Sequence, residues 1–128
     1  MNSILINRIA KIIVALILLQ TLYFKFTASP ESVFIFTKLG AEPFGRIGSG
    51  IIELLASVFL FVNITKFYAA FAAMSTMFVA VISHLFVIGI EVENDGGTLF
   101  VLACITFILS LFLAFRYKKD INFLTKKL

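Results

Sequence analysis

The segment "FYAAFAAMSTMFVAVISHLFVIGI", residues 67 to 90, decides the fold, because it contains no Asp, Glu, Lys or Arg. A helix that crosses the hydrocarbon core of a bilayer needs about 20 mostly apolar residues. This segment meets the requirement without interruption. It therefore predicts a membrane-spanning helix over about 67–89.

The composition of the whole chain agrees with a membrane protein. Of its 128 residues, 61% are hydrophobic and only 14% are charged. Soluble proteins average about 45–50% apolar and about 25% charged residues. A soluble chain of this length could not bury so much apolar surface in one core. We therefore expect the chain to lie in a lipid bilayer.

Three further segments predict membrane spans, at about 4–25, 47–63 and 97–116, and the second of these is short. No internal repeat, low-complexity stretch or linker separates them. The prediction is therefore a single all-α domain over residues 1–128, a membrane-embedded four-helix bundle. The first segment is similar to a secretory signal, but Pro30 is badly placed for cleavage, so we expect a retained span.

The first outer loop, residues 26–46, predicts a short additional helix. Ser29 is a suitable N-cap, Pro30 a suitable first helical residue, Glu31 falls in the first turn, and Gly40 is a stop signal. The segment between these signals is apolar on more than one side. We therefore expect a short interfacial helix that lies on, or dips into, the outer membrane surface.

The distribution of basic residues predicts the orientation. With four spans, both termini lie on the same side of the membrane, and the side richer in Lys and Arg is cytoplasmic. We expect a multi-pass protein of the inner (cytoplasmic) membrane with both termini in the cytoplasm. The cytoplasmic side then collects Arg8, Lys11, Lys66, Arg116, Lys118, Lys119, Lys126 and Lys127, against Lys25, Lys38 and Arg46 outside.

The ionisable residues inside the predicted spans include Glu53 in the second and His84 in the third. Such a residue costs about 2.5–3.5 kcal/mol on insertion scales and by default indicates function. Arg46 lies seven residues before Glu53, and Glu91 lies seven residues after His84. Seven residues are about 10 Å along a helix and about 20° in rotation. If both helices are continuous, each buried residue lies beneath a charged residue at the outer surface.

Gln20, in the first span, lies five residues before Lys25 and so at a depth similar to that of Glu53 and His84. Three polar side chains on three helices, in one layer, predict a polar pocket that opens outward. Small residues share the helix faces of Glu53 and His84 and allow close packing. A purely structural role, in which these groups fix helix register or anchor the membrane surface, is the alternative. We assign proton handling to Glu53 and His84, and ligand binding to Gln20, Lys25, Arg46, Glu91 and Asp95.

Several kinds of site are excluded. One His and one Cys supply too few ligands for the usual metal sites, so we expect no metal. The single cysteine, Cys104, excludes an internal disulfide. No P-loop, dinucleotide fingerprint or catalytic triad is present. The basic residues that give the net charge of +4 cluster at the predicted membrane edges, and nothing indicates binding of nucleic acid.

What remains is proton-linked chemistry or the binding of a small, partly apolar molecule. Histidine exchanges protons near neutral pH. A carboxylate and an imidazole that are reachable from the lipid suit a quinone head group, whose reduction consumes protons. The same pair suits a proton-coupled transporter.

Two stretches carry a resemblance to a known family: "SPESVFIFTKLGAEPFGRIGSGIIELLA", residues 29–56, and "SHLFVIGIEVENDGGTLFVLA", residues 83–103, together with Lys25 and Phe26. The chain resembles the DoxX family of small four-helix membrane proteins over roughly residues 8–116. The family takes its name from a membrane subunit of a thiosulfate:quinone oxidoreductase. The resemblance implies a link to redox metabolism and polar positions at Lys25, Glu53 and His84, while the single cysteine speaks against thiol–disulfide chemistry.

Three functions remain open at this point. The first is a redox-associated membrane protein that binds a quinone-like or other small lipophilic ligand in an outward-facing polar pocket. Any enzyme activity would then be that of a subunit of a quinone-linked membrane oxidoreductase. The second is a non-catalytic accessory subunit or assembly factor of a membrane complex, and the third is a proton-coupled small-molecule transporter. Quinone is the one cofactor suggested, and the expected partners are the lipid bilayer and either a membrane-complex subunit or a second copy of the chain.

Overall fold

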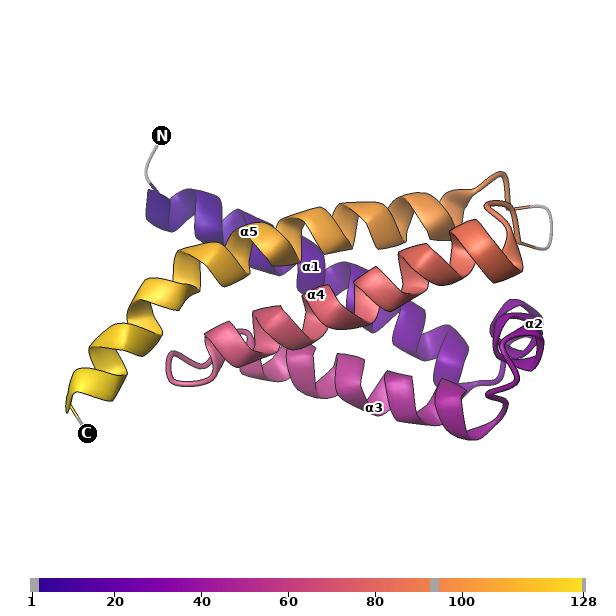
Figure 1. Cartoon of the computed structure of the whole chain (residues 1–128), viewed down its shortest axis with the longest axis horizontal. Coiled ribbons are helices and arrows are strands. Elements are labelled where there is room, and N and C mark those ends of the chain that lie inside the picture. The colour runs from indigo at the N-terminus through magenta and orange to yellow at the C-terminus, as the bar shows by residue number, and fades with distance from the viewer. Residues whose placement is uncertain (1–2, 93–94, 128) are drawn as a thin grey trace.

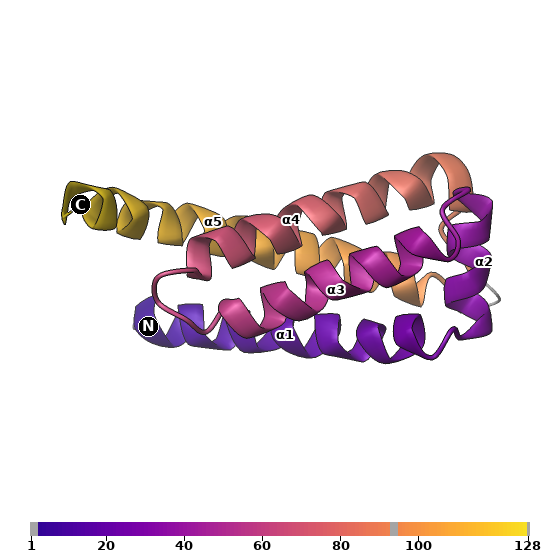
Figure 2. The same ribbon diagram turned by 90° about the horizontal axis from the view of Figure 1, so that it is seen from below.

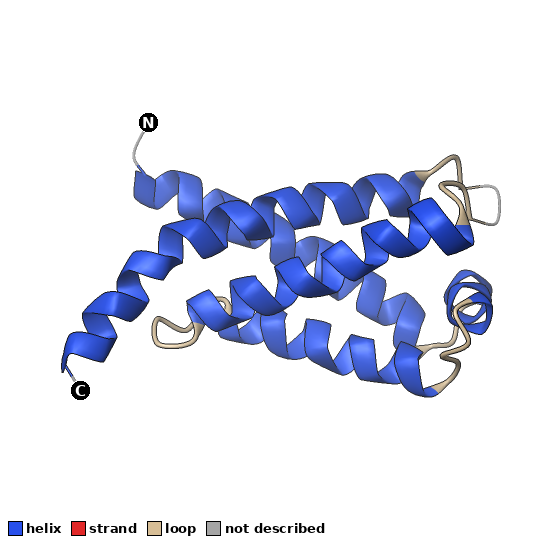
Figure 3. Ribbon diagram, in the orientation of Figure 1, coloured by secondary structure: helices blue, strands red, loops and turns tan. Residues whose placement is uncertain are grey.

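The computed structural model describes residues 3–92 and 95–127, and the side chains of residues 4–92 and 95–118. All regular secondary structure in these residues is helical, which confirms the all-α prediction (Figure 3). The elements are α1 (Ser3–Phe26), α2 (Pro30–Lys38), α3 (Phe44–Phe59), α4 (Lys66–Ser83), the π-helical turn η1 (His84–Ile88) and α5 (Thr98–Lys127).

Three stretches of helix are long and apolar enough to cross a membrane: Ile4–Phe26, Lys66–Ile88 and Thr98–Lys118. At most 28% of the most apolar window of any of them is buried within the chain. Their outward faces therefore expose Ile, Leu, Val and Phe over a far larger area than monomeric soluble proteins expose. The chain is a small multi-pass integral membrane protein.

Helix α3 differs from the span predicted at 47–63. It begins at Phe44, continues through its three glycines, and ends at Phe59 after 16 residues. Its length of about 24 Å is less than the hydrocarbon thickness of about 30 Å. The Thr65 hydroxyl donates to the Phe59 carbonyl at 2.9 Å and closes the turn. The apolar residues at 60–62 therefore belong to that turn, and the helix ends before the predicted end of this segment at residue 63.

The four longer helices pack as two pairs, α1 with α3 and α4 with α5. Contacts of α3 with α4 and of α1 with α5 join the pairs into a bundle (Figures 1 and 2). Figure 1 shows the pairs close together near the chain termini and diverging toward α2, which lies across the opposite end. Both termini therefore lie at the end of the bundle away from α2.

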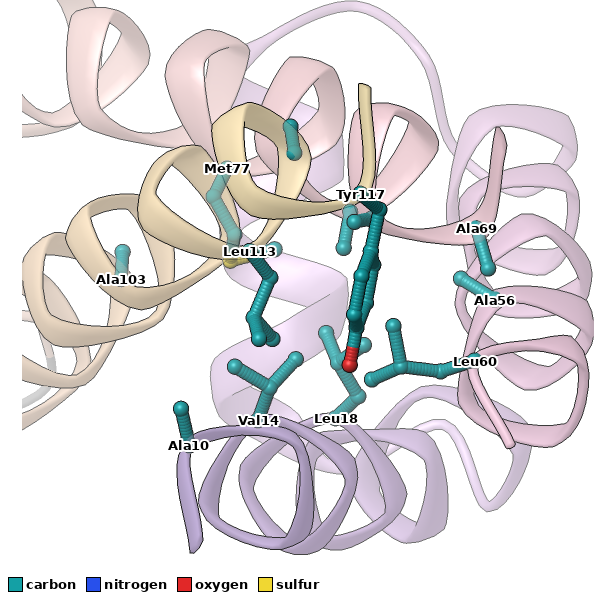
Figure 4. Packing of buried hydrophobic residues seen from close by; sticks show 13 residues of the cluster. Ala10, Val14, Leu18, Ala56, Leu60, Ala69, Met77, Ala103, Leu113 and Tyr117 are labelled. Atoms are coloured by element: carbon teal, nitrogen blue, oxygen red, sulfur yellow. The ribbon is translucent and has the colours of Figure 1, made fainter. Parts of the chain in front are cut away.

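Small side chains let the helices approach closely where the pairs meet. Val14 and Leu18 of α1 pack against Leu60, Leu113 and alanines of the other helices (Figure 4). The predicted small-residue stripes are used here, between helices of the same chain. Ala69 and Ala73 of α4 are buried, as are Ala103, Thr106, Ser110 and Ala114 of α5.

Helix α2 confirms the helix predicted in the first loop. Ser29 is its N-cap and accepts the Ser32 N–H at 3.3 Å, Pro30 is its first residue, and Gly40 follows its end with φ +72°. Only glycine adopts this left-handed conformation without strain. The helix contacts α1, α3 and η1, so it covers the end of the bundle.

Candidate ligand-binding site

A cavity of about 620 Å³ lies at the α2 end, where the helix pairs diverge. Side chains from α1, α2, α3, α4, η1 and α5 line it, and about half of them are apolar. Pockets for small ligands have volumes of about 300–1,000 Å³ and combine apolar walls with a few polar groups. Five of the seven residues predicted from the sequence line this cavity, namely Gln20, Lys25, Glu53, His84 and Asp95.

Glu53 forms a buried ion pair with Lys25 at one wall of the cavity. Its Oε1 accepts from Lys25 Nζ. Its Oε2 lies 3.3 Å from the Thr21 hydroxyl, which shares its one hydrogen with the Leu18 carbonyl at 2.9 Å. The Glu53 side chain is 0% exposed and that of Lys25 is 15% exposed. Breaking such a pair leaves a charge without compensation in a medium of low dielectric constant. The partner of Glu53 is thus a lysine on α1.

Close packing of α1 on α3 makes this pair possible. Gly50 lies one turn before Glu53, and a Cβ at Gly50 would be 2.8 Å from the ring of Phe26. The glycine therefore lets the end of α1, with Lys25, lie directly against α3. Lysine in the last turn of α1 also interacts favourably with the helix dipole.

Arg46 is buried but does not line the cavity. Its Nε donates to both carboxylate oxygens of Glu42, at 2.9 and 3.0 Å, and its Nη1 donates to the backbone carbonyl of Lys25. The guanidinium thus satisfies a carbonyl at the C-terminal end of α1. Arg46, in the first turn of α3, thus joins the end of α1 to α3 and fixes the position of the Lys25 backbone.

His84 begins the π-helical turn and is buried at a second wall of the cavity. Its Nδ1 lies 2.9 Å from the carbonyl oxygen of Gly89. A carbonyl oxygen only accepts, so Nδ1 carries a hydrogen and Nε2 is the ring nitrogen left for a ligand. The edge of the ring packs on Phe100, with 5.6 Å between centroids. Single π-helical turns of this kind occur frequently at functional sites.

Glu91 does not lie above His84 as predicted, because the helix is not continuous there. Helix η1 ends at Ile88, and Gly89 has φ +94°, so the chain turns away. Glu91 is exposed and accepts a long hydrogen bond from the Gly96 N–H, at 3.4 Å. It is not among the residues that line the cavity.

Asp95 lines the cavity and also caps α5. Burial raises the pKa of Asp95, but hydrogen bonds from backbone N–H groups and the nearby His84 outweigh this effect and lower the pKa below its ordinary value. The donors to its carboxylate are the N–H groups of Val92 at 3.0 Å, Gly97 at 2.7 Å and Leu99 at 3.1 Å.

This lowered pKa predicts a pH-dependent contribution to stability. The contribution of Asp95 is fully present above the ordinary pKa of 3.8 and is lost as the pH falls through the lower pKa of the folded state. We expect Asp95→Ala to destabilise the protein by about 0.5–2 kcal/mol at pH 6, and by less as the pH falls below 3.8. Thermal unfolding of both proteins in detergent between pH 6 and 3 tests this. A stability difference that is constant over this range would contradict it.

Gln20 lines the cavity but is exposed on the outside of α1. Its side chain forms no hydrogen bond with another described residue. Several polar residues of the cavity were not predicted, because hydroxyl residues give no ionisable signal and α2 was expected on the membrane surface. They are Thr21, Glu31, Ser32, Ser49, Thr76, Ser83 and Thr98.

Among the described residues, no group of three or more His, Cys, Asp or Glu side chains is placed to hold a metal ion. Cys104 is half-buried in α5 with a free thiol and does not line the cavity.

No family model matches the chain, and no curated protein or solved structure matches it either. The class of protein follows from the structure itself. The chain is a small, all-helical integral membrane protein with at least three helices able to cross a bilayer, and a cavity with apolar walls and a few polar groups lies at one end of its bundle.

Proposed function

We propose that α1, α3, α4 and α5 all cross the inner membrane, with both termini in the cytoplasm and the cavity in the outer half of the bilayer. Helix α3 lies between α1 and α4 and exposes apolar residues along its length, among them Ile51 and Leu55. Apolar residues of the following turn, such as Phe61 and Ile64, extend its apolar length. Local thinning of the bilayer accommodates a short span at modest cost.

We further propose that the cavity binds a small, partly apolar molecule with a quinone-like head group. The observation that carries this proposal is the convergence of the Lys25–Glu53 ion pair and His84 on one cavity. A neutral His84 accepts a hydrogen bond from a hydroxyl at Nε2, and a protonated one donates to a carbonyl. A quinone changes between carbonyl and hydroxyl on reduction, so one site serves both forms.

The DoxX resemblance agrees with this redox association and rests on the sequence stretches at 29–56 and 83–103 alone. Any oxidoreductase activity would belong to a complex in which this chain binds the quinone. An accessory subunit would use its small-residue helix faces to pack against a partner protein. In this chain the small residues pack between its own helices instead. The transporter function has no observation in its favour beyond the two ionisable residues.

The experiment is ligand-dependent thermal stabilisation of the purified protein in detergent, with a short-chain benzoquinone as probe. A ligand at 100 times its Kd stabilises the folded state by about 2.7 kcal/mol. We expect Glu53→Gln and His84→Ala to lose most of this stabilisation. Glu42→Gln is the matched control, because Glu42 pairs with Arg46 and does not line the cavity. Equal stabilisation in all four proteins would contradict the proposed site.

A further inference from the structure

We propose that the ligand of this cavity is an amphiphile with a single tail and an uncharged head, and that its tail leaves sideways between α1 and α5 into the lipid. This inference rests on the proposed function and adds the charge of the ligand, its shape and its route. The opening is named here the α1–α5 opening and is defined by Gln20, Phe24, Thr98 and Leu102.

Helix α1 presents two different faces to the cavity. Leu18, Thr21 and Lys25 lie on the face toward α3, where Lys25 meets Glu53. Gln20 and Phe24 line the same cavity from the adjacent face, and both are exposed on the outside of the protein. A residue that both lines a cavity and faces outward stands at its edge. These two residues therefore mark one side of an opening.

Helix α5 forms the other side of the opening. Leu102 lines the cavity, and so does Thr98, which is exposed. The buried cluster that joins α1 to α5 includes Val14 and Leu113 (Figure 4). Along their helices these two residues lie farther from α2 than Gln20 and Leu102 do. Beyond this cluster the two helices diverge toward α2 (Figure 1). The opening consequently lies between the apolar surfaces of two membrane helices, which a hydrocarbon tail can contact favourably.

The charges of the cavity select the head group. Three carboxylates line it, those of Glu31, Glu53 and Asp95, against one lysine that is already paired with Glu53. An anionic head, such as a phosphate or a fatty-acid carboxylate, meets net repulsion there. The imidazole of His84 remains to form a hydrogen bond with an uncharged head.

The test compares two uncharged benzoquinones, one with a decyl tail and one without a tail, and decanoate as an anionic amphiphile. Binding is followed by thermal stabilisation of the protein in detergent. The variants are Gln20→Trp and Leu102→Trp, which fill the α1–α5 opening from either side. Ile108→Trp is the matched control, because Ile108 is an exposed apolar residue of α5 that does not line the cavity.

We expect the two opening variants to weaken binding of the tailed quinone at least tenfold and to leave the tailless quinone within about threefold. Ile108→Trp leaves both unchanged, and decanoate does not stabilise the wild-type protein. Retained binding of the tailless quinone also shows that the variants are folded. If the opening variants leave binding of the tailed quinone unchanged, if Ile108→Trp weakens it as much as they do, or if decanoate binds as well as the quinones, this inference is overturned while the proposed function stands. If the wild-type protein binds neither quinone, both fall.

Discussion

Replacing Lys25 with methionine is expected to destabilise the protein by about 3 kcal/mol or more. The substitution removes the counter-charge of Glu53, whose side chain is 0% exposed, and leaves the carboxylate with only the Thr21 hydroxyl at 3.3 Å. Methionine keeps the length of the aliphatic chain, so packing between α1 and α3 is largely retained. The free energy of unfolding, measured by denaturation in mixed micelles, gives the effect directly.

Two further variants separate this ion pair from general effects of losing a lysine. Lys38→Met, at an exposed lysine of α2, is expected to change stability by less than about 0.5 kcal/mol. The double variant Lys25→Met with Glu53→Gln removes both charges together and should recover much of the loss. Equal effects of Lys25→Met and Lys38→Met would show that the ion pair contributes little to the fold.

The second prediction concerns His84, whose Nδ1 donates to the Gly89 carbonyl and whose Nε2 is left to bind the ligand. Asparagine places an amide near the position of Nδ1 and can still donate to the Gly89 carbonyl, whereas glutamine places its amide near the position of Nε2. We therefore expect His84→Asn to keep most of the stability and to weaken binding of a short-chain benzoquinone at least tenfold, about 1.4 kcal/mol. His84→Gln should keep more of the binding and lose the stability that the bond to Gly89 provides, about 1 kcal/mol.

Measurement of both stability and Kd for each variant decides between the roles. If His84 served only to close the π-helical turn, binding and stability would change in parallel in the two variants. The opposite order, with weaker binding in His84→Gln than in His84→Asn, would assign the ligand to Nδ1 and contradict the geometry described above.

The sequence predicts most of the fold, because uninterrupted apolar length is a reliable sign of a membrane helix. It places α1, α4 and α5 within a few residues, apart from the extension of α5 to Lys127, and it places α2 from its cap residues. It misses the end of α3, because apolarity continues through Leu60 and Phe61 although the helical hydrogen bonding does not. The bond from the Thr65 hydroxyl that closes this turn leaves no mark in hydropathy.

The sequence predicts that the residues of the candidate site share one depth in the bilayer, but it does not predict which of them form an ion pair. Counting residues from the charged ends placed Gln20, Glu53 and His84 in one layer, and the structure brings all three to one cavity. The pairing of Glu53 with Lys25 depends on how α1 rotates against α3, which counting residues along each helix does not predict. The close approach of Phe26 to Gly50 is visible only in the structure. The predicted position of Glu91 failed because Gly89 was counted inside a continuous helix.

Binding of an uncharged quinone in the cavity is the central claim, and a single introduced tryptophan tests it most directly, because the chain contains none. Phe36→Trp places the fluorophore in the cavity wall beside Lys25, whose Nζ lies 5.7 Å from the ring centroid of Phe36. Phe115→Trp places it on an exposed, lipid-facing position of α5 outside the cavity. Quinones quench tryptophan fluorescence on contact. We predict saturable quenching by a short-chain benzoquinone at position 36 that His84→Asn weakens, and only linear quenching at position 115. Linear, unsaturable quenching of equal strength at both positions would contradict the account.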